Sequence, residues 1–203
     1  MMKNIWMQSI LAALLASSAL SLGSLTLVHA DTEEVKIKGT TGDDTITIDE
    51  TTNTITASAG VTITVDEVAC ASPCTITGAS SNQFKVEGRG SVTTDTIAIA
   101  DGGGNDIYDI KAGSTITATV TDGAGNDNYK FRGDAGNDQV TYTDGAGSDK
   151  VNFEGKAGDD NFGATDSSSN NDKYQFQGGA GIGDTFTVSD ATGDSGDKYD
   201  LKP

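Results

Sequence analysis

The sequence predicts an all-β protein in which short strands wind into a right-handed parallel β-roll or β-solenoid with about 22 residues per coil. Three observations predict this fold: the composition, an internal repeat and the period-two alternation of the segments between the repeat turns. After residue 30 the chain contains one leucine, Leu201, and no Met, Trp or His. Long helices need leucine and other unbranched residues, whereas the Thr, Ile, Val, Tyr and Phe found here favour strands.

The repeat is clearest between residues 122 and 165. Segment 122–143 and segment 144–165 are identical at 11 of 22 positions, and 101–121 and 166–189 are looser copies. Each unit divides into two halves of 11 residues, each with a six-residue turn and a five-residue segment. Turns that open with Asp alternate with turns that open with Gly, so we expect two turns to complete one coil and like turns to stack.

The five-residue segments alternate strictly between polar and apolar residues, as strands with one buried face do. Segment 128–132 is Asn-Tyr-Lys-Phe-Arg, so Tyr129 and Phe131 share one face. The same phase returns at Val140/Tyr142, Val151/Phe153, Tyr174/Phe176, Phe186/Val188 and Tyr199/Leu201. Upstream strands are expected at 35–38, 45–49, 54–58, 61–65, 74–77, 84–87, 96–100 and 115–121. About 16 strands at this spacing predict seven to eight coils, a rod about 35 Å long.

The amino terminus has the pattern of a secretory signal peptide. Lys3 precedes an apolar stretch over 10–27, and Val28-His29-Ala30 forms a small-residue cleavage site before Asp31. Residues 1–30 are therefore predicted to be removed on export. We expect a secreted, cell-surface or periplasmic protein that does not insert into a membrane after cleavage.

The two cysteines fit an exported protein. Cys70 and Cys74 lie four residues apart around Pro73, and we expect them to form a local disulfide. A redox site favours a spacing of two intervening residues, and a metal site needs more soft ligands than the chain offers after residue 30.

The acidity of the chain excludes several classes of partner. The whole chain has a formal charge of -17, and residues 31–203 carry 12 Lys and Arg against 30 Asp and Glu. Nucleic acids and anionic membranes need clusters of cationic side chains, so we expect no nucleic-acid partner. The absence of histidine after residue 30 and the predicted closure of both cysteines indicate a protein that is not an enzyme.

The repeat turns resemble a known family. The turns 101–106, 122–127, 133–138, 144–149 and 155–160, with an isolated copy at 39–44, are similar to the calcium-binding nonapeptide of repeats-in-toxin (RTX, hemolysin-type) proteins. Four consecutive copies follow at steps of 11 residues, where the family step is nine. The longer strands predict a wider core, which the second aromatic residue of each strand fills.

The resemblance implies calcium as the ligand, bound between turns two apart in sequence. By position it makes the last Asp of each turn a ligand: Asp106, Asp127, Asp138, Asp149 and Asp160. The degraded turns contribute Asp44, Asp95 and Asp172, and the preceding residues Asn105, Asn126, Asn137 and Asp159 are secondary ligands. Calcium prefers six to eight oxygen ligands, carboxylates and carbonyls included, and glycine permits the turns that aim carbonyls inward.

The sequence therefore predicts three regions: the signal peptide 1–30, degenerate solenoid coils with a disulfide over 31–100, and a calcium-binding β-roll over 101–203. The main functional expectation is an exported, non-enzymatic module that folds on calcium. Its expected role is structural, surface or adhesive, with cell-surface polysaccharide or other surface proteins as partners. Two alternatives stay open. One is a carbohydrate-active or carbohydrate-binding solenoid. The other is an ice- or surface-binding protein with threonine ladders, suggested by the Thr-Ile-Thr runs at 45–47, 54–56, 62–64 and 75–77.

Overall fold

The computed structural model describes residues 33–76, 81–89, 94–191 and 196–202. Over these ranges the chain forms strands and no helix, as the composition predicts. The predicted signal peptide lies outside the described residues, and so does Thr77 of the predicted strand 74–77. Among the residues described, no helix is long and apolar enough to span a membrane.

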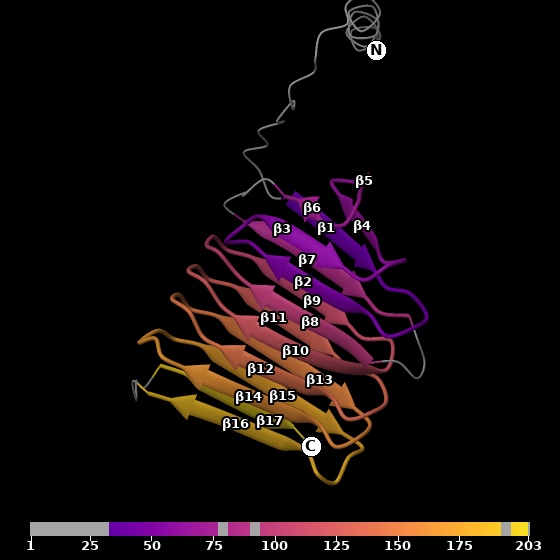
Figure 1. The fold of residues 1–203 in the computed structure, drawn as a ribbon. Helices are drawn as coiled ribbons and strands as arrows, with labels where there is room; N and C mark the ends of the chain where they lie inside the picture. Colours follow the sequence, from indigo (N-terminus) through magenta and orange to yellow (C-terminus); the bar gives the residue numbers. More distant parts are fainter. Residues whose placement is uncertain (1–32, 77–80, 90–93, 192–195, 203) are drawn as a thin grey trace, which may run out of the picture.

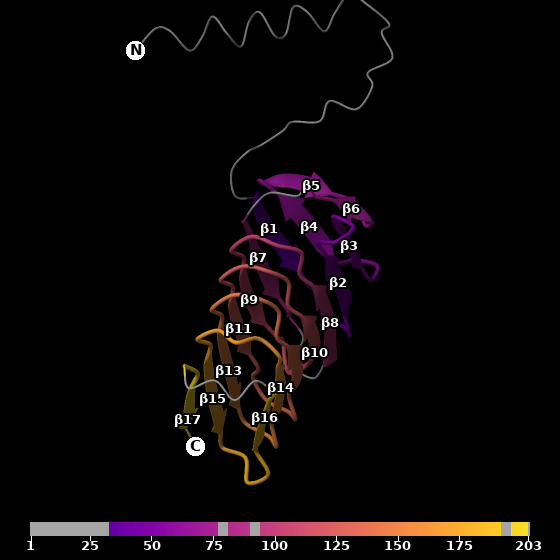
Figure 2. The ribbon, with the colours of Figure 1, turned by 90° about the vertical axis from the view of Figure 1, so that its left-hand side faces the viewer.

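The strands form two sheets that face each other across the core (Figure 2). Sheet A has the spatial order β17 (Lys198–Lys202), β15 (Lys173–Gly179), β13 (Lys150–Lys156), β11 (Asn128–Arg132), β9 (Ile107–Lys111), β7 (Asn82–Glu87), β1 (Glu33–Lys38), β4 (Thr62–Val65) and β5 (Val68–Cys70). Sheet B has the order β16 (Thr185–Asp190), β14 (Asn161–Asp166), β12 (Gln139–Thr143), β10 (Thr115–Thr121), β8 (Thr94–Ala100), β2 (Thr45–Asp49), β3 (Thr54–Ala57) and β6 (Cys74–Thr75).

From β7 onward the chain alternates between the sheets, and each strand pairs in parallel with the strand two places later (Figure 1). Ile107 of β9 pairs with Asn128 of β11, which in turn pairs with Lys150 of β13. One coil takes about 23 residues, and five consecutive coils run from β7–β8 to β15–β16, with β17 beginning another. The β-solenoid is thus confirmed, with fewer consecutive coils than the predicted seven to eight.

The N-terminal region differs from the predicted run of parallel coils. Strands β1 and β2 join the solenoid, because they pair in parallel with β7 and β8. Strands β3 to β6 instead pair antiparallel, β4 on β1 and β3 on β2. The reason is local: Asn53 between β2 and β3, and Asp66 and Glu67 between β4 and β5, have φ between 47° and 66°. Such tight turns reverse the chain within one sheet, where a six-residue turn would advance it by half a coil.

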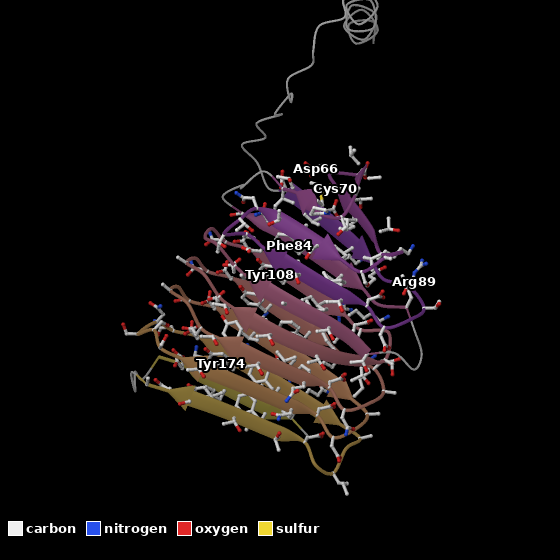
Figure 3. The ribbon with its side chains drawn as sticks, in the orientation of Figure 1. Asp66, Cys70, Phe84, Arg89, Tyr108 and Tyr174 are labelled. Carbon is white, nitrogen blue, oxygen red and sulfur yellow. A yellow bond between two sulfur atoms is a disulfide. The ribbon has the colours of Figure 1, made fainter. Side chains whose placement is uncertain are left out.

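The antiparallel strands cover the N-terminal end of the solenoid and contain the disulfide. Cys70 and Cys74 are bonded, with Cα atoms 5.5 Å apart, which confirms the predicted pairing. Asp66 and Cys70 lie at this end of the molecule in Figure 3. The disulfide connects β5 of sheet A to β6 of sheet B, so it joins the two sheets where no further coil does.

The core lies between the sheets and contains the apolar residue of each alternating pair. Tyr129, Phe131, Tyr142 and Phe153 are essentially inaccessible to solvent. Rings stack along the axis, for example Phe84 on Tyr108 with centroids 4.8 Å apart (Figure 3). Among the described residues the stack ends at β17, the edge strand of sheet A, where Tyr199 and Leu201 are 43% and 57% exposed.

Candidate metal centres

The turns that lead from sheet B to sheet A form one long edge of the solenoid, here called the Asp edge. It consists of Glu50 and the turns 101–106, 122–127, 144–149 and 166–172, with Asp190 and Asp197 at its C-terminal end. The opposite edge, here called the Gly edge, contains the turns 39–44, 133–138, 155–160 and 178–184. Like turns stack on like turns, as the repeat predicts: Gly103 bridges to Ala124, Ala124 to Ala146, and Ala135 to Ala157.

Glycine is required in these turns because successive coils approach closely. A Cβ on Gly147 would lie 1.2 Å from the carbonyl oxygen of Gly125 in the preceding coil. Gly136 and Gly158, at the fourth position of turns on the Gly edge, have φ of 128° and 123°. Residues with a Cβ atom rarely adopt these backbone angles. The repeated glycines therefore allow the turn backbones to stack at the strand spacing.

The Asp edge brings acidic side chains together in threes. Each group combines the first acid of one turn, the first Asp of the next turn and the last Asp of that next turn. Within a group, one carboxylate oxygen from each residue lies within 4.8 Å of the others. The five groups are Glu50/Asp101/Asp106, Asp101/Asp122/Asp127, Asp122/Asp144/Asp149, Asp144/Asp166/Asp172 and Asp166/Asp190/Asp197. The first Asp of a turn therefore belongs to two neighbouring groups.

Backbone amides hold the last Asp of each of these turns in place. The Asp106 N–H donates to Asp127 Oδ1 at 2.6 Å, and the Asp127 N–H donates to Asp149 Oδ1 at 2.7 Å. These three residues, Asp106, Asp127 and Asp149, are at most 2% exposed. Their other carboxylate oxygen, Oδ2, is buried and has no hydrogen-bond partner. A buried carboxylate oxygen without a partner is costly, and a cation would satisfy it.

A tyrosine hydroxyl lies beside every group. Tyr108 donates to Glu50 Oε1 at 2.5 Å or to Asp101 Oδ1 at 2.6 Å, and Tyr129 donates to Asp122 Oδ1 at 2.5 Å. Tyr174 reaches Asp166 Oδ2 at 3.3 Å, and Tyr199 reaches Asp197 Oδ2 at 3.3 Å. These hydroxyls orient the carboxylates from the core side.

The third group obtains its tyrosine from the opposite sheet. In β13 the position between Tyr129 and Tyr174 is Val151. Tyr142 of β12 takes the space, with its ring 5.3 Å from Tyr129 and 6.1 Å from Tyr174. Its hydroxyl lies 3.5 Å from Asp144 Oδ1. The third group therefore also has a tyrosine hydroxyl beside it, although this tyrosine belongs to sheet B and not to sheet A.

The charge of the Asp edge is not balanced by the protein. In the described part of the chain, Lys and Arg form salt bridges only with Glu34, Glu87, Asp109, Asp134 and Asp200, none of which belongs to a group. Burial raises the pKa of Glu50, Asp106 and Asp127 to about 7, and neighbouring carboxylates add to the effect. Burial likewise raises the pKa of Asp149, where the charges of Asp122 and Asp127 act in the same direction.

The Gly edge is built differently, and no group of three acids forms there among the described residues. Asp138 and Asp160 accept backbone N–H groups at 2.7 and 2.9 Å, and their Oδ2 atoms lie where a Cβ on Gly133 or Gly155 would be. Asp44 accepts from the backbone and the hydroxyl of Thr40. Asp95 accepts from the Gly113 N–H at 3.1 Å.

Of the ligands predicted from the sequence, Asp106, Asp127, Asp149 and Asp172 lie in acidic groups, whereas Asp138, Asp160, Asp44 and Asp95 lie on the Gly edge. The predicted secondary ligands lie outside the groups. Asn105 Oδ1 accepts from the Asn126 N–H, Asn126 Oδ1 from the Ser148 N–H, and Asn137 Oδ1 from the Asp159 N–H. Asp159 Oδ1 accepts from the Gly183 N–H. These side chains form ladders along the outside of the turns.

Sequence reasoning missed seven members of the groups: Glu50, Asp101, Asp122, Asp144, Asp166, Asp190 and Asp197. A signal for several of them was present, because every second turn opens with Asp in place of the family's glycine. Glu50 carries no such signal, since its turn is not a repeat turn.

Comparisons with protein-family models, with curated proteins and with solved structures find no match to this chain. The similarity to RTX repeats therefore stays an interpretation of the turn motif, and the chemistry of the site has to be argued from its own geometry.

Proposed function

We propose that this protein is an exported, non-enzymatic calcium-binding β-solenoid that folds on calcium and acts as a structural, surface or adhesive module. The observation that carries the proposal is the column of five acidic groups on the Asp edge. It contains 11 carboxylates, most of them buried, and no salt-bridged cation within the described residues. Such a column is stable only if protons or metal ions neutralise it.

The donor set favours calcium over other metals. The side-chain donor atoms of all five groups are carboxylate oxygens. Hard oxygen donors suit Ca²⁺ and Mg²⁺, whereas zinc and copper sites use histidine or cysteine. Ca²⁺ accepts irregular shells of six to eight oxygens, while Mg²⁺ demands a small octahedron and gives up water reluctantly.

Coupling to folding follows from the arrangement of the ligands. Each group combines residues of successive coils, so no complete group exists in the unfolded chain. Metal binding to the stacked coils therefore adds directly to the free energy of folding. The charge of residues 31–203 opposes compaction in the absence of metal.

Far-ultraviolet circular dichroism of the purified protein tests the proposal. We expect EGTA to reduce the β signal, millimolar Ca²⁺ to restore it, and Mg²⁺ to restore it poorly. Isothermal titration should give up to five ions per chain, one for each acidic group. Identical spectra and melting temperatures in Ca²⁺ and in EGTA would show that the turns do not bind calcium.

A further inference from the structure

The outer faces of the two sheets differ in charge. After residue 31 the chain has 12 Lys and Arg, and 11 of them lie on strands of sheet A. No Lys or Arg lies on a strand of sheet B, where Asp49 is the only charged residue at an outward position of the described strands. In an acidic, highly charged protein, a whole face with a single charged side chain and no cationic one calls for a physical role.

The outward positions of sheet B are mostly threonine, and the strands place them in columns. We call the outward side chains of β3, β2, β8, β10, β12, β14 and β16 the threonine face. Across β2, β8 and β10 one column runs Thr45, Thr96, Thr117. A second column runs Thr121, Thr143, Thr165 and Ser189 across β10, β12, β14 and β16. None of these side chains is buried, so the face presents hydroxyl and methyl groups to solvent.

The columns form a two-dimensional array. Neighbouring strands lie about 4.8 Å apart, and alternate residues of one strand lie about 6.7 Å apart. The parallel register repeats without a break from β2 to β16. The surface of a crystalline solid repeats in two directions, as this array does. The surface of a folded protein or a flexible glycan chain does not repeat in two directions.

Two other occupants fit the face less well. Crystalline polysaccharides are usually bound by flat aromatic side chains that stack on sugar rings, but the aromatic residues of sheet B, Tyr142, Phe162 and Phe186, point toward the core. A second copy of the chain would need more area. The face measures roughly 29 Å by 13 Å between outer Cα positions, about 400 Å², while a stable dimer buries about 800 Å² on each partner.

We propose that the threonine face binds the surface of ice. The rows of water molecules in hexagonal ice repeat at distances close to those of the array. Each threonine hydroxyl can take the place of one water in such a row, and the methyl group beside it holds no water of its own. A charged side chain would keep its hydration shell and oppose freezing at the surface. The absence of Lys and Arg from this face is therefore a requirement of the proposed role.

An ice-partition experiment tests the proposal. A film of ice is grown slowly from a solution of the calcium-loaded protein, and the concentrations in ice and in liquid are compared. We expect enrichment in the ice, which is lost when Thr119→Lys and Thr143→Lys are combined. The matched control combines Asn152→Lys and Gln177→Lys on sheet A, adds the same charge, and should stay enriched. Circular dichroism checks that each variant is folded.

A second double variant keeps the test decisive if the lysine variant does not fold. Thr119→Tyr with Thr143→Tyr adds no charge and suits a strand, yet it disturbs the array, so enrichment should again be lost. Exclusion of the folded wild-type protein from ice overturns the proposal, as does equal enrichment of the variants of the two sheets. Binding to microcrystalline cellulose or chitin without enrichment in ice, or a dimer in sedimentation that the sheet B variants abolish, also overturns it. The proposal does not depend on calcium binding. If the chain stays folded in EGTA, the same ice-partition experiment can be carried out without calcium.

Discussion

The sharing of carboxylates between neighbouring groups makes a quantitative prediction. Asp122 belongs to two acidic groups, and Asp127 belongs to one. Replacing Asp122 by Asn should therefore impair two calcium sites, whereas Asp127→Asn should impair one. Asp159→Asn is the matched control, because it removes one charge from an exposed turn position where related turns have Asn105, Asn126 and Asn137.

The size of the effect follows from linkage. Extracellular calcium sites have Kd values of about 10⁻⁴–10⁻³ M, so at about 10 mM Ca²⁺ one site contributes about 1.4–2.7 kcal/mol to the free energy of unfolding. Loss of two sites then costs about 3–5 kcal/mol. For a chain of this size that lowers the melting temperature by roughly 6–20 °C. The single site lost in Asp127→Asn should cost about half as much.

The assay is thermal unfolding followed by circular dichroism, with each variant measured in Ca²⁺ and in EGTA. The difference between the two conditions isolates the calcium-dependent part. This matters because Asp122 accepts the Gly145 N–H at Oδ2, at 3.1 Å, and the Tyr129 hydroxyl at Oδ1, and a side-chain amide has only one oxygen to accept them. If Asp122→Asn loses no more calcium-dependent stability than Asp159→Asn, the assignment of the Asp edge as the metal column is wrong.

Three further predictions concern the same chain. Burial raises the pKa of Glu50, Asp106 and Asp127 to about 7, so the metal-free folded protein binds more protons than the unfolded chain between about pH 4 and pH 7. In EGTA the folded state should therefore be most stable near pH 4 and lose stability as the pH rises through this window, which circular dichroism at several pH values measures. The calcium affinity should rise over the same window because bound ions displace protons, and calorimetry measures it. Tyr142 lies beside the third group, which the hydroxyls of Tyr129 and Tyr174 also approach, so Tyr142→Phe should lower the tyrosine-sensitised luminescence of bound Tb³⁺ by at most the share of one group, and unchanged emission would contradict this placement. Mass spectrometry of the exported protein should show Asp31 as its first residue, and a retained Met1 or Met2 would reject cleavage after Ala30.

The sequence by itself determined the all-β class, the solenoid and the stacking of like turns. These features follow from local physics that a repeat makes visible. Alternation at Tyr129 and Phe131 gives a strand with one buried face, and glycine at fixed positions gives turns that can stack. The disulfide between Cys70 and Cys74 was also predictable, because the chain has only these two cysteines and they lie four residues apart.

Only the tertiary structure decided which carboxylates meet. Position in the motif predicted both Asp138 and Asp127 as calcium ligands. In the structure Asp138 lies against Gly133 on the Gly edge, whereas Asp127 faces two first-position Asp residues on the Asp edge. Similarly, the threonines of sheet B become an array only through strand register, which the uneven N-terminal spacing did not reveal. The antiparallel strands β3 to β6 were hidden for the same reason. Register and the choice of edge depend on contacts between residues about 23 positions apart or more, and local sequence carries no direct record of those contacts.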